Sequence, residues 1–219
     1  MKRVIYVLAF VLLFLTNSFA GASEELLESA NTLKDMLRTE NKIPKSILQK
    51  SLAIVVIPSA KRVGFFVGAE FGEGVASIKK SDGTWSNPFF IKLSGGSFGW
   101  QFGFDVNSIL LIFNSSKSVN SLLTKSITMG IDASISAGPL AKTFEKNSKI
   151  DLSAEVFSYR KSEGLFLGAS VKGAVISQDS DKNIEYYGNG VGAKTIVNLQ
   201  NKQDSYAIKE FFKAINVIR

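Results

Sequence analysis

Aromatic and small residues alternate most regularly over residues 95–105, which read Gly-Gly-Ser-Phe-Gly-Trp-Gln-Phe-Gly-Phe-Asp. Every second position holds a ring, and the positions between are small or polar; the rings are Phe98, Trp100, Phe102 and Phe104. A period of two is the period of a β-strand, whose successive side chains point to opposite faces. One face therefore carries four rings, and the recurring glycines indicate a sharp bend or a close backbone approach. The pattern predicts a central core strand in a strongly curved sheet.

Apolar runs of strand length follow one another through the middle of the chain. Residues 127–137 alternate cleanly between apolar and polar or small side chains, which predicts one half-buried strand. Pro58 is expected to end the first strand of the chain, and residues 81–84 read as a hairpin turn. The other strands are predicted at residues 53–57, 63–71, 75–79, 88–93, 109–113, 152–160 and 165–176.

Helices are predicted at both ends of the chain. The first begins at Ser23, a residue type that caps helices, and acidic residues follow in the first turn. Its apolar residues recur on one face, at Leu26, Ala30, Leu33 and Leu37. We expect this face to pack on the sheet; a position on a membrane surface is the alternative. Further helices are predicted from Pro44, over residues 115–124 and from Ser205 to the end.

This order of elements predicts an α+β fold in a single domain. The domain is built on a strongly curved antiparallel sheet or a barrel-like core, with N-terminal and C-terminal helices packed on it. The domain is expected to span residues 21–219, because no linker long or polar enough to separate two domains interrupts them.

The first twenty residues have the organisation of a signal peptide. Lys2 and Arg3 precede an apolar run over residues 4–15, and the small residues Ser18 and Ala20 suit cleavage after residue 20. A retained membrane anchor is the alternative, but the apolar run is shorter than the roughly 20 residues that a spanning helix needs. We therefore expect residues 1–20 to be a signal peptide and the protein to be exported.

The chain contains neither cysteine nor histidine, which narrows its chemistry. Disulfides, a thiol nucleophile, a histidine base and zinc sites of the usual kind are excluded. Serines are plentiful but lack the settings that activate them as nucleophiles. No catalytic residue, metal site or cofactor is predicted, and the chain is not expected to be an enzyme. The formal net charge of +7 falls to 7 − 2 = +5 without Lys2 and Arg3 of the signal peptide. This basic excess suits anionic lipid headgroups, and it also suits nucleic acid or solubility alone; an exported protein meets lipid sooner than nucleic acid.

Two motifs resemble ligand-binding loops but are better explained by structure. The Gly188-x-Gly190-x-Gly192 segment lacks the Gly-Lys-Ser/Thr of a phosphate loop, and bends in a curved sheet explain its glycines. The Asp179-x-Asp181-x-Asn183 segment matches the start of a calcium loop but lacks its later glycine and glutamate. A hairpin turn is the preferred interpretation.

Basic residues gather at predicted strand ends and turns. These candidate lipid-binding residues are Lys61, Arg62, Lys79, Lys80, Arg160 and Lys161. Near an anionic membrane surface each can contribute up to about 1 kcal/mol. A rim of solvated lysines is the alternative explanation.

Between residues 43 and 188 the sequence resembles the SYLF domain family. The resemblance is an ordered set of short motifs, each weak alone and specific together. They include the run 53–58, Lys61, the run 64–68, Gly72-Glu73-Gly74, Asp82-Gly83-x-Trp85-Ser86-x-Pro88, residues 95–103 with Gln101, Ala137-Gly138-Pro139, residues 158–168 and Tyr186-Tyr187-Gly188.

The resemblance implies a lipid-binding module without catalysis, of a kind also described as an actin-binding domain in yeast. Combined with export, it implies a periplasmic bacterial version that associates peripherally with an anionic phospholipid membrane surface. Nucleic acid and actin are not expected partners, and an envelope protein partner is possible. A small outer-membrane β-barrel or an envelope structural or protein-interaction module is the alternative function.

Overall fold

The structure is a computed structural model that describes residues 21–38, 43–140, 153–162, 165–168, 171–200 and 205–218. Within it, only the path of the strand is described for residues 64–67 and 97–104. The predicted signal peptide, residues 1–20, lies outside the described residues. So do the side chains of Phe98, Trp100, Phe102 and Phe104.

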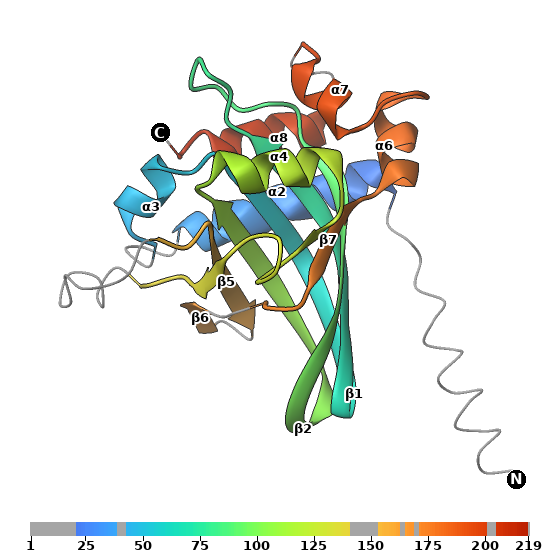
Figure 1. Ribbon diagram of the computed structural model, residues 1–219. Coiled ribbons are helices and arrows are strands. Elements are labelled where there is room, and N and C mark those ends of the chain that lie inside the picture. The colour runs from blue at the N-terminus through green and yellow to red at the C-terminus, as the bar shows by residue number, and fades with distance from the viewer. Residues whose placement is uncertain are drawn as a thin grey trace, which may run out of the picture.

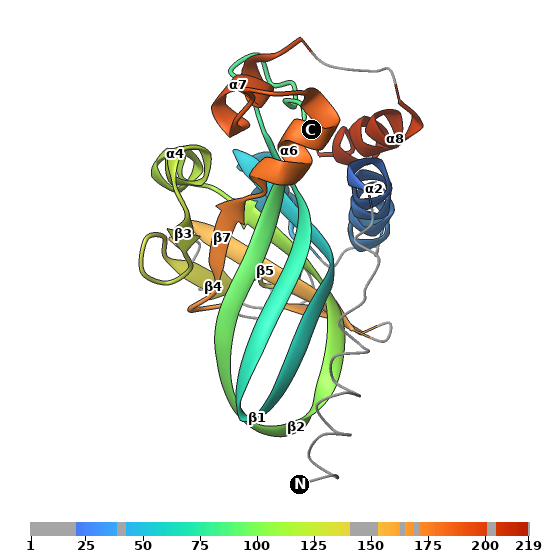
Figure 2. The ribbon, with the colours of Figure 1, turned by 90° about the vertical axis from the view of Figure 1, so that its right-hand side faces the viewer.

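Two very long strands form the frame of the sheet. β1 (Ala53–Ile78) and β2 (Phe89–Phe113) pair antiparallel along almost their whole length. Both run to one narrow end of the molecule and turn back there, so the sheet curls strongly (Figure 1 and Figure 2). The strands predicted at 53–57, 63–71 and 75–79 are therefore one strand, and those at 88–93, 95–105 and 109–113 are another.

Pro58 does not end β1, contrary to the prediction. The pairing of β1 with β2 shifts register between Ile57 and Ala60, so Pro58 lies in an irregular part of the ladder. Proline has no N–H to donate, and a bulge is one of the few places in a sheet that tolerates it. Its carbonyl oxygen accepts a hydrogen bond from the Ser108 hydroxyl on β2, at 2.8 Å, and the strand continues.

Five shorter strands complete a seven-stranded sheet around β2. All neighbours pair antiparallel except β4 and β5, which are parallel. The α+β class and the strongly curved sheet are thus confirmed. The short strands are β3 (Ile127–Thr128), β4 (Ile135–Ala137), β5 (Val156–Ser162), β6 (Leu165–Gly168) and β7 (Val175–Gln178).

Tight turns divide two segments that were predicted as continuous strands. The alternating segment 127–137 is split into β3 and β4, because Gly130 adopts a positive φ of 83° and the Asp132 side chain accepts the Thr128 N–H at 2.8 Å. Ile131 consequently points into solvent, 81% exposed. The segment 165–176 is divided in the same way by a turn at Gly173, whose φ is 87°.

The glycines of residues 188–192 do not bend the sheet. Gly188 and Gly190 adopt positive φ values of 96° and 77° in the connection that follows α6 (Ser180–Tyr187). Gly192 is the N-cap residue of α7 (Ala193–Asn198). The interpretation as bends in the sheet is therefore wrong, because Gly188 and Gly190 supply positive-φ backbone to a link between two helices and Gly192 begins the second of them.

Helices cover both faces of the sheet, and the outer face is defined here as the one that contacts α2. α2 (Ala22–Arg38) and α8 (Tyr206–Ile215) pack there with Ile54, Val56 and Leu110. The apolar stripe predicted for the first helix is buried in this layer, so the helix packs on the sheet as expected. The Ser205 hydroxyl accepts the Ile208 N–H at 3.2 Å and caps α8, as its sequence indicates.

The inner face is the opposite side, which carries Val55, Ile57 and Leu111. α4 (Ser116–Thr124) and α7 pack against it, while α3 (Lys45–Gln49) joins the outer layer. Successive residues of β1 thus enter two separate hydrophobic cores, as expected for a strand buried on both faces. Among the described residues, no helix is long and apolar enough to cross a membrane.

Candidate functional site

The sheet separates the six candidate lipid-binding residues into three groups. Lys61 pairs with Val106 of β2, and Lys161 of β5 pairs with Ser108, two residues further along the same strand. Residues two apart share a face, so Lys61 and Lys161 both lie on the outer face. Their neighbours Arg62 and Arg160 are directed to the inner face.

Lys79 and Lys80 follow Ile78, the last residue of β1, and lie apart from the other four candidate lipid-binding residues. The Lys79 ammonium lies 5.7 Å from the centroid of the Trp85 ring. The Lys80 N–H donates to the Thr84 carbonyl at 2.7 Å and closes the predicted turn. These two lysines are thus part of the 80–85 turn, where a cation over a ring contributes about 0.5–1 kcal/mol at an exposed site.

Three exposed apolar side chains lie on the same outer face as Lys61. Val63 is 47% exposed, Phe71 44% and Val106 41%. Val63 and Val106 neighbour Lys61 through the β1–β2 ladder, and Phe71 shares the outer face with Val75 of the α2 layer. We call this surface the outer patch; it consists of Lys61, Val63, Phe71, Val106 and Lys161.

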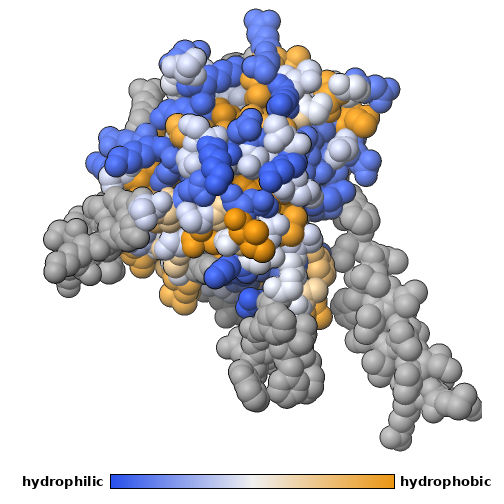
Figure 3. Space-filling view, in the orientation of Figure 1, coloured by the Kyte–Doolittle hydropathy of each residue, from blue (hydrophilic) through white to orange (hydrophobic). Residues whose placement is uncertain are grey.

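The opposite side of the molecule has a different surface. Figure 3 shows the side on which α4 lies, where hydrophilic residues cover most of the upper part. Hydrophobic residues gather lower down, next to the narrow end of the sheet. On this side the described surface is thus more apolar below the level of α4.

Two of the six candidate lipid-binding residues form ion pairs with carboxylates. The Arg160 guanidinium pairs with Glu70 of the returning half of β1 at 2.5 Å, and both side chains are largely buried. The Lys161 ammonium contacts the Asp35 carboxylate near the end of α2. Arg160 therefore stabilises the curl of the sheet, while Lys161 joins the outer patch to α2.

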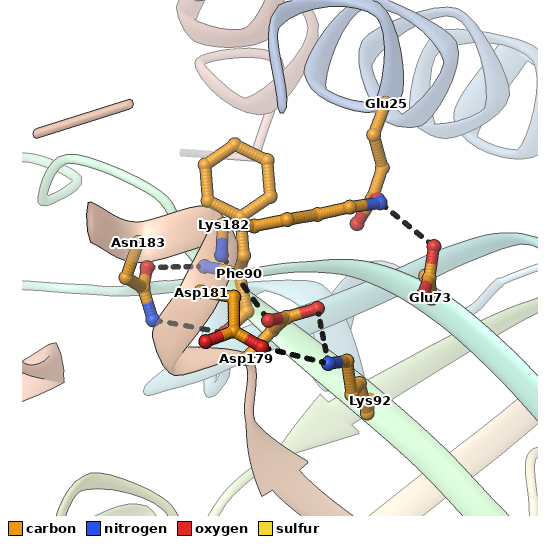
Figure 4. Close-up of polar contacts among 8 residues, drawn as sticks. All are labelled: Glu25, Glu73, Phe90, Lys92, Asp179, Asp181, Lys182 and Asn183. Atoms are coloured by element: carbon orange, nitrogen blue, oxygen red, sulfur yellow. Dashed lines mark hydrogen bonds and ion pairs between the residues drawn. The ribbon is translucent and has the colours of Figure 1, made fainter. Parts of the chain in front are cut away.

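A buried ionic cluster, which was not predicted, links α6, α2 and β1. Lys182 of α6 extends its ammonium to Glu25 of α2 and to Glu73 of β1, the latter at 2.7 Å (Figure 4). The Lys182 and Glu25 side chains are 8% and 4% exposed. Burial lowers the pKa of Lys182; burial, followed by the nearby Asp179 carboxylate, raises the pKa of Glu73.

Residues 179–183 form a helix start, and the hairpin-turn interpretation is wrong. The Asp179 side chain accepts the Lys182 N–H at 3.2 Å and caps α6. It also forms an ion pair with Lys92 of β2 at 3.1 Å (Figure 4). Asn183 accepts the Phe90 N–H at 2.8 Å through its side-chain oxygen and so fixes α6 to β2. An Asp three residues before Lys182 is a capping signal that the sequence contains.

The described residues offer little for catalysis or metal binding. No group of three or more carboxylates among them is placed to hold a metal ion. A cavity of about 350 Å³ lies between α3 and the start of β5, with Lys50 and Glu155 in its wall. The Glu155 carboxylate is already bound, by the Ser115 hydroxyl at 2.9 Å and the Ser134 N–H at 2.9 Å, and these hydrogen bonds lower its pKa. The Glu155 carboxylate thus has a structural role.

Fold and surface together define an α+β domain in which a curled sheet is covered by helices on both faces. The chain belongs to the Ysc84 family, described as Las17-binding protein actin regulator, which residues 94–218 match. This finding confirms the resemblance to SYLF domains that the sequence motifs indicate.

The curated relatives match this chain over part of their own length. LAS seventeen-binding protein 3 of Saccharomyces cerevisiae is 34% identical over 158 residues, covering 71% of this chain and 34% of the relative. The SH3 domain-containing protein PJ696.02 of Schizosaccharomyces pombe is 31% identical over 186 residues, covering 84% and 43%. SH3 domain-containing YSC84-like protein 1 of Homo sapiens is 30% identical over 156 residues, covering 71% and 45%. The chain thus spans about a third to a half of these relatives.

Proposed function

We propose that the protein is a non-enzymatic phospholipid-binding module that acts peripherally at a membrane of the cell envelope. Export to the periplasm is part of this proposal and is supported by the signal-peptide pattern of residues 1–20. The observation that carries the proposal is the outer patch, where exposed apolar side chains alternate with lysines on one face of the sheet. Without Lys2 and Arg3 of the signal peptide the net charge is 7 − 2 = +5, which has the sign that an anionic surface attracts.

The composition of the outer patch suits the boundary between headgroups and acyl chains. Transfer of a valine or phenylalanine side chain out of water contributes roughly 1.5–3 kcal/mol when burial is complete. A lysine near an anionic surface adds up to about 1 kcal/mol. Three half-exposed apolar side chains and two lysines therefore support reversible, salt-sensitive binding.

Replacement of Val106 by aspartate is expected to weaken partitioning onto anionic vesicles by about tenfold or more. The change removes an apolar contact with the membrane and adds a carboxylate that the anionic surface repels. The substitution is compatible with the fold, since Val106 is 41% exposed and lies opposite Lys61 in the ladder. Flotation of the purified protein with neutral and anionic liposomes, at low and high salt, measures the effect.

Ile131→Asp is the matched control, because Ile131 is a more exposed aliphatic residue in the turn between β3 and β4. It introduces the same charge away from the outer patch and is expected to float almost like the wild type. Equal flotation of the two variants would exclude the outer patch as the binding surface. Absence of wild-type flotation with either liposome would reject lipid binding.

An envelope protein is the second candidate partner, and a different surface favours it. β6 lies at the side of β5, and its Leu165 and Leu167 are exposed on either side of the buried Phe166. Exposed apolar residues on a sheet margin suit contact with another protein. Affinity capture that recovers a partner in stoichiometric amount from wild type, but not from a Leu165→Asp variant, would support this function.

A further inference from the structure

The contact between Lys161 and Asp35 places one carboxylate of the protein directly on the outer patch. Lys161 is an outer-face residue of β5, and Asp35 lies in the last turn of α2. The Asp35 side chain is 58% exposed and that of Lys161 is 24% exposed. The pair thus lies at the border between the helix layer and the surface proposed to meet lipid.

The solvent exposure of this pair makes its net contribution small. Ion pairs of exposed side chains change an equilibrium constant by a factor of up to about five. A lysine at an anionic membrane surface contributes a factor of similar size. The ammonium of Lys161 can therefore exchange the carboxylate for lipid phosphate at little net cost.

Two other ion pairs of the protein differ from this one in burial. Arg160 with Glu70 and Lys182 with Glu25 are largely shielded from solvent, and an approaching membrane cannot replace the carboxylate in either pair. Breaking such a buried pair leaves an uncompensated charge inside the protein. Of the three, only the pair of Lys161 and Asp35 has the exposure that exchange requires.

We propose that Asp35 is an intramolecular competitor of anionic lipid for Lys161, so that membrane binding breaks the contact between α2 and β5. This inference rests on the proposed lipid-binding function of the outer patch. In solution the carboxylate neutralises one of the two lysines of the patch. On the membrane, phosphate takes the ammonium, and the last turn of α2 loses one of its attachments to the sheet.

Asp35→Asn is expected to strengthen partitioning onto anionic liposomes about fivefold, because it frees Lys161 and one more lysine then attracts the anionic surface. Partitioning onto neutral liposomes is expected to be unchanged. Glu24→Gln is the matched control. It removes the same charge from the same helix, at an exposed position in the first turn. Its effect measures the contribution of net charge alone, which is expected to be less than twofold at physiological salt.

The double variant Asp35→Asn/Lys161→Gln tests whether the gain depends on Lys161. When Asp35→Asn is added to the Lys161→Gln variant, partitioning onto anionic liposomes is expected to change no more than it does when Glu24→Gln is made in wild type. Hydrogen exchange adds a readout on the helix: amides in the last turn of α2 are expected to exchange faster when wild type is bound to anionic liposomes.

The outcomes separate this inference from the proposed function. Binding by Asp35→Asn but not by wild type would support the competition. Wild-type binding with equal effects of Asp35→Asn and Glu24→Gln would overturn the competition and leave lipid binding intact. If neither wild type nor Asp35→Asn floats, both proposals fail. Thermal unfolding of Asp35→Asn is expected to match wild type, which excludes misfolding as the cause.

Discussion

Gly74→Ala is expected to lower the free energy of unfolding by about 3 kcal/mol or more, a large fraction of the stability of an ordinary domain. Gly74 lies in the returning half of β1, where the strand crosses its own first half. A Cβ atom at this position would lie 2.0 Å from the Val56 carbonyl oxygen and 2.9 Å from the Ile57 Cα. Both are backbone atoms, so the clash can be relieved only by moving the two halves of the strand apart.

Gly96→Ala provides the matched control in the partner strand. A Cβ atom built on Gly96 meets nothing within 4 Å, and its φ is not in the left-handed region. Alanine there is expected to leave the free energy of unfolding within about 0.5 kcal/mol of wild type. Urea unfolding followed by circular dichroism gives both values. Equal midpoints for the two variants would show that β1 does not pack on itself at Gly74.

Glycine content indicated a curved sheet, but not the way in which one strand folds back on itself. Periodicity reports which side chains share a face, and it is the same for two short strands as for one long strand with a bulge. Pro58 and the glycine-rich stretch that follows it look like ends of strands for this reason. A register shift at Pro58 and the close approach of Gly74 to Val56 depend on the tertiary arrangement of β1 and β2. A single sequence does not contain them.

The sequence alone indicates in part how the basic residues are distributed between the two faces of the sheet. Adjacent residues of a strand point to opposite faces, so Lys61 and Arg62 cannot share a surface, nor can Arg160 and Lys161. Their carboxylate partners could not be foreseen in the same way. Asp35 lies 126 residues from Lys161. This pair forms only when α2 packs on the folded sheet.

The sequence does not predict the ionic cluster around Lys182, because its residues belong to elements far apart in the chain. Asp179 and Asn183 suit a turn, but an Asp with a second acid two residues later also suits a helix start. Glu25 lies in a first helical turn, where acids are common on the surface, so its sequence position does not indicate burial. Only the packing of α6 against α2 turns these separate signals into one buried cluster.

Lys182→Met is expected to destabilise the protein by about 3–5 kcal/mol, because it leaves the Glu25 carboxylate buried without its cation. Glu73 is less affected, since its side chain is 30% exposed and water reaches it. Lys213→Met is the control: Lys213 is 70% exposed in its ion pair with Glu210, and its loss is expected to change stability by less than about 1 kcal/mol. Urea unfolding at pH 7 measures both variants.

The double variant Glu25→Leu/Lys182→Met is expected to recover most of the stability that Lys182→Met loses. Burial lowers the pKa of Lys182, because desolvation of the charged ammonium costs free energy. Apolar side chains of similar volume at both positions remove this cost, and such exchanges are often neutral or stabilising. A double variant as unstable as Lys182→Met would mean that the ion pair itself holds α6 on α2. Recovery would show that shape and apolar contact hold these helices together, and that the buried charges only determine their register.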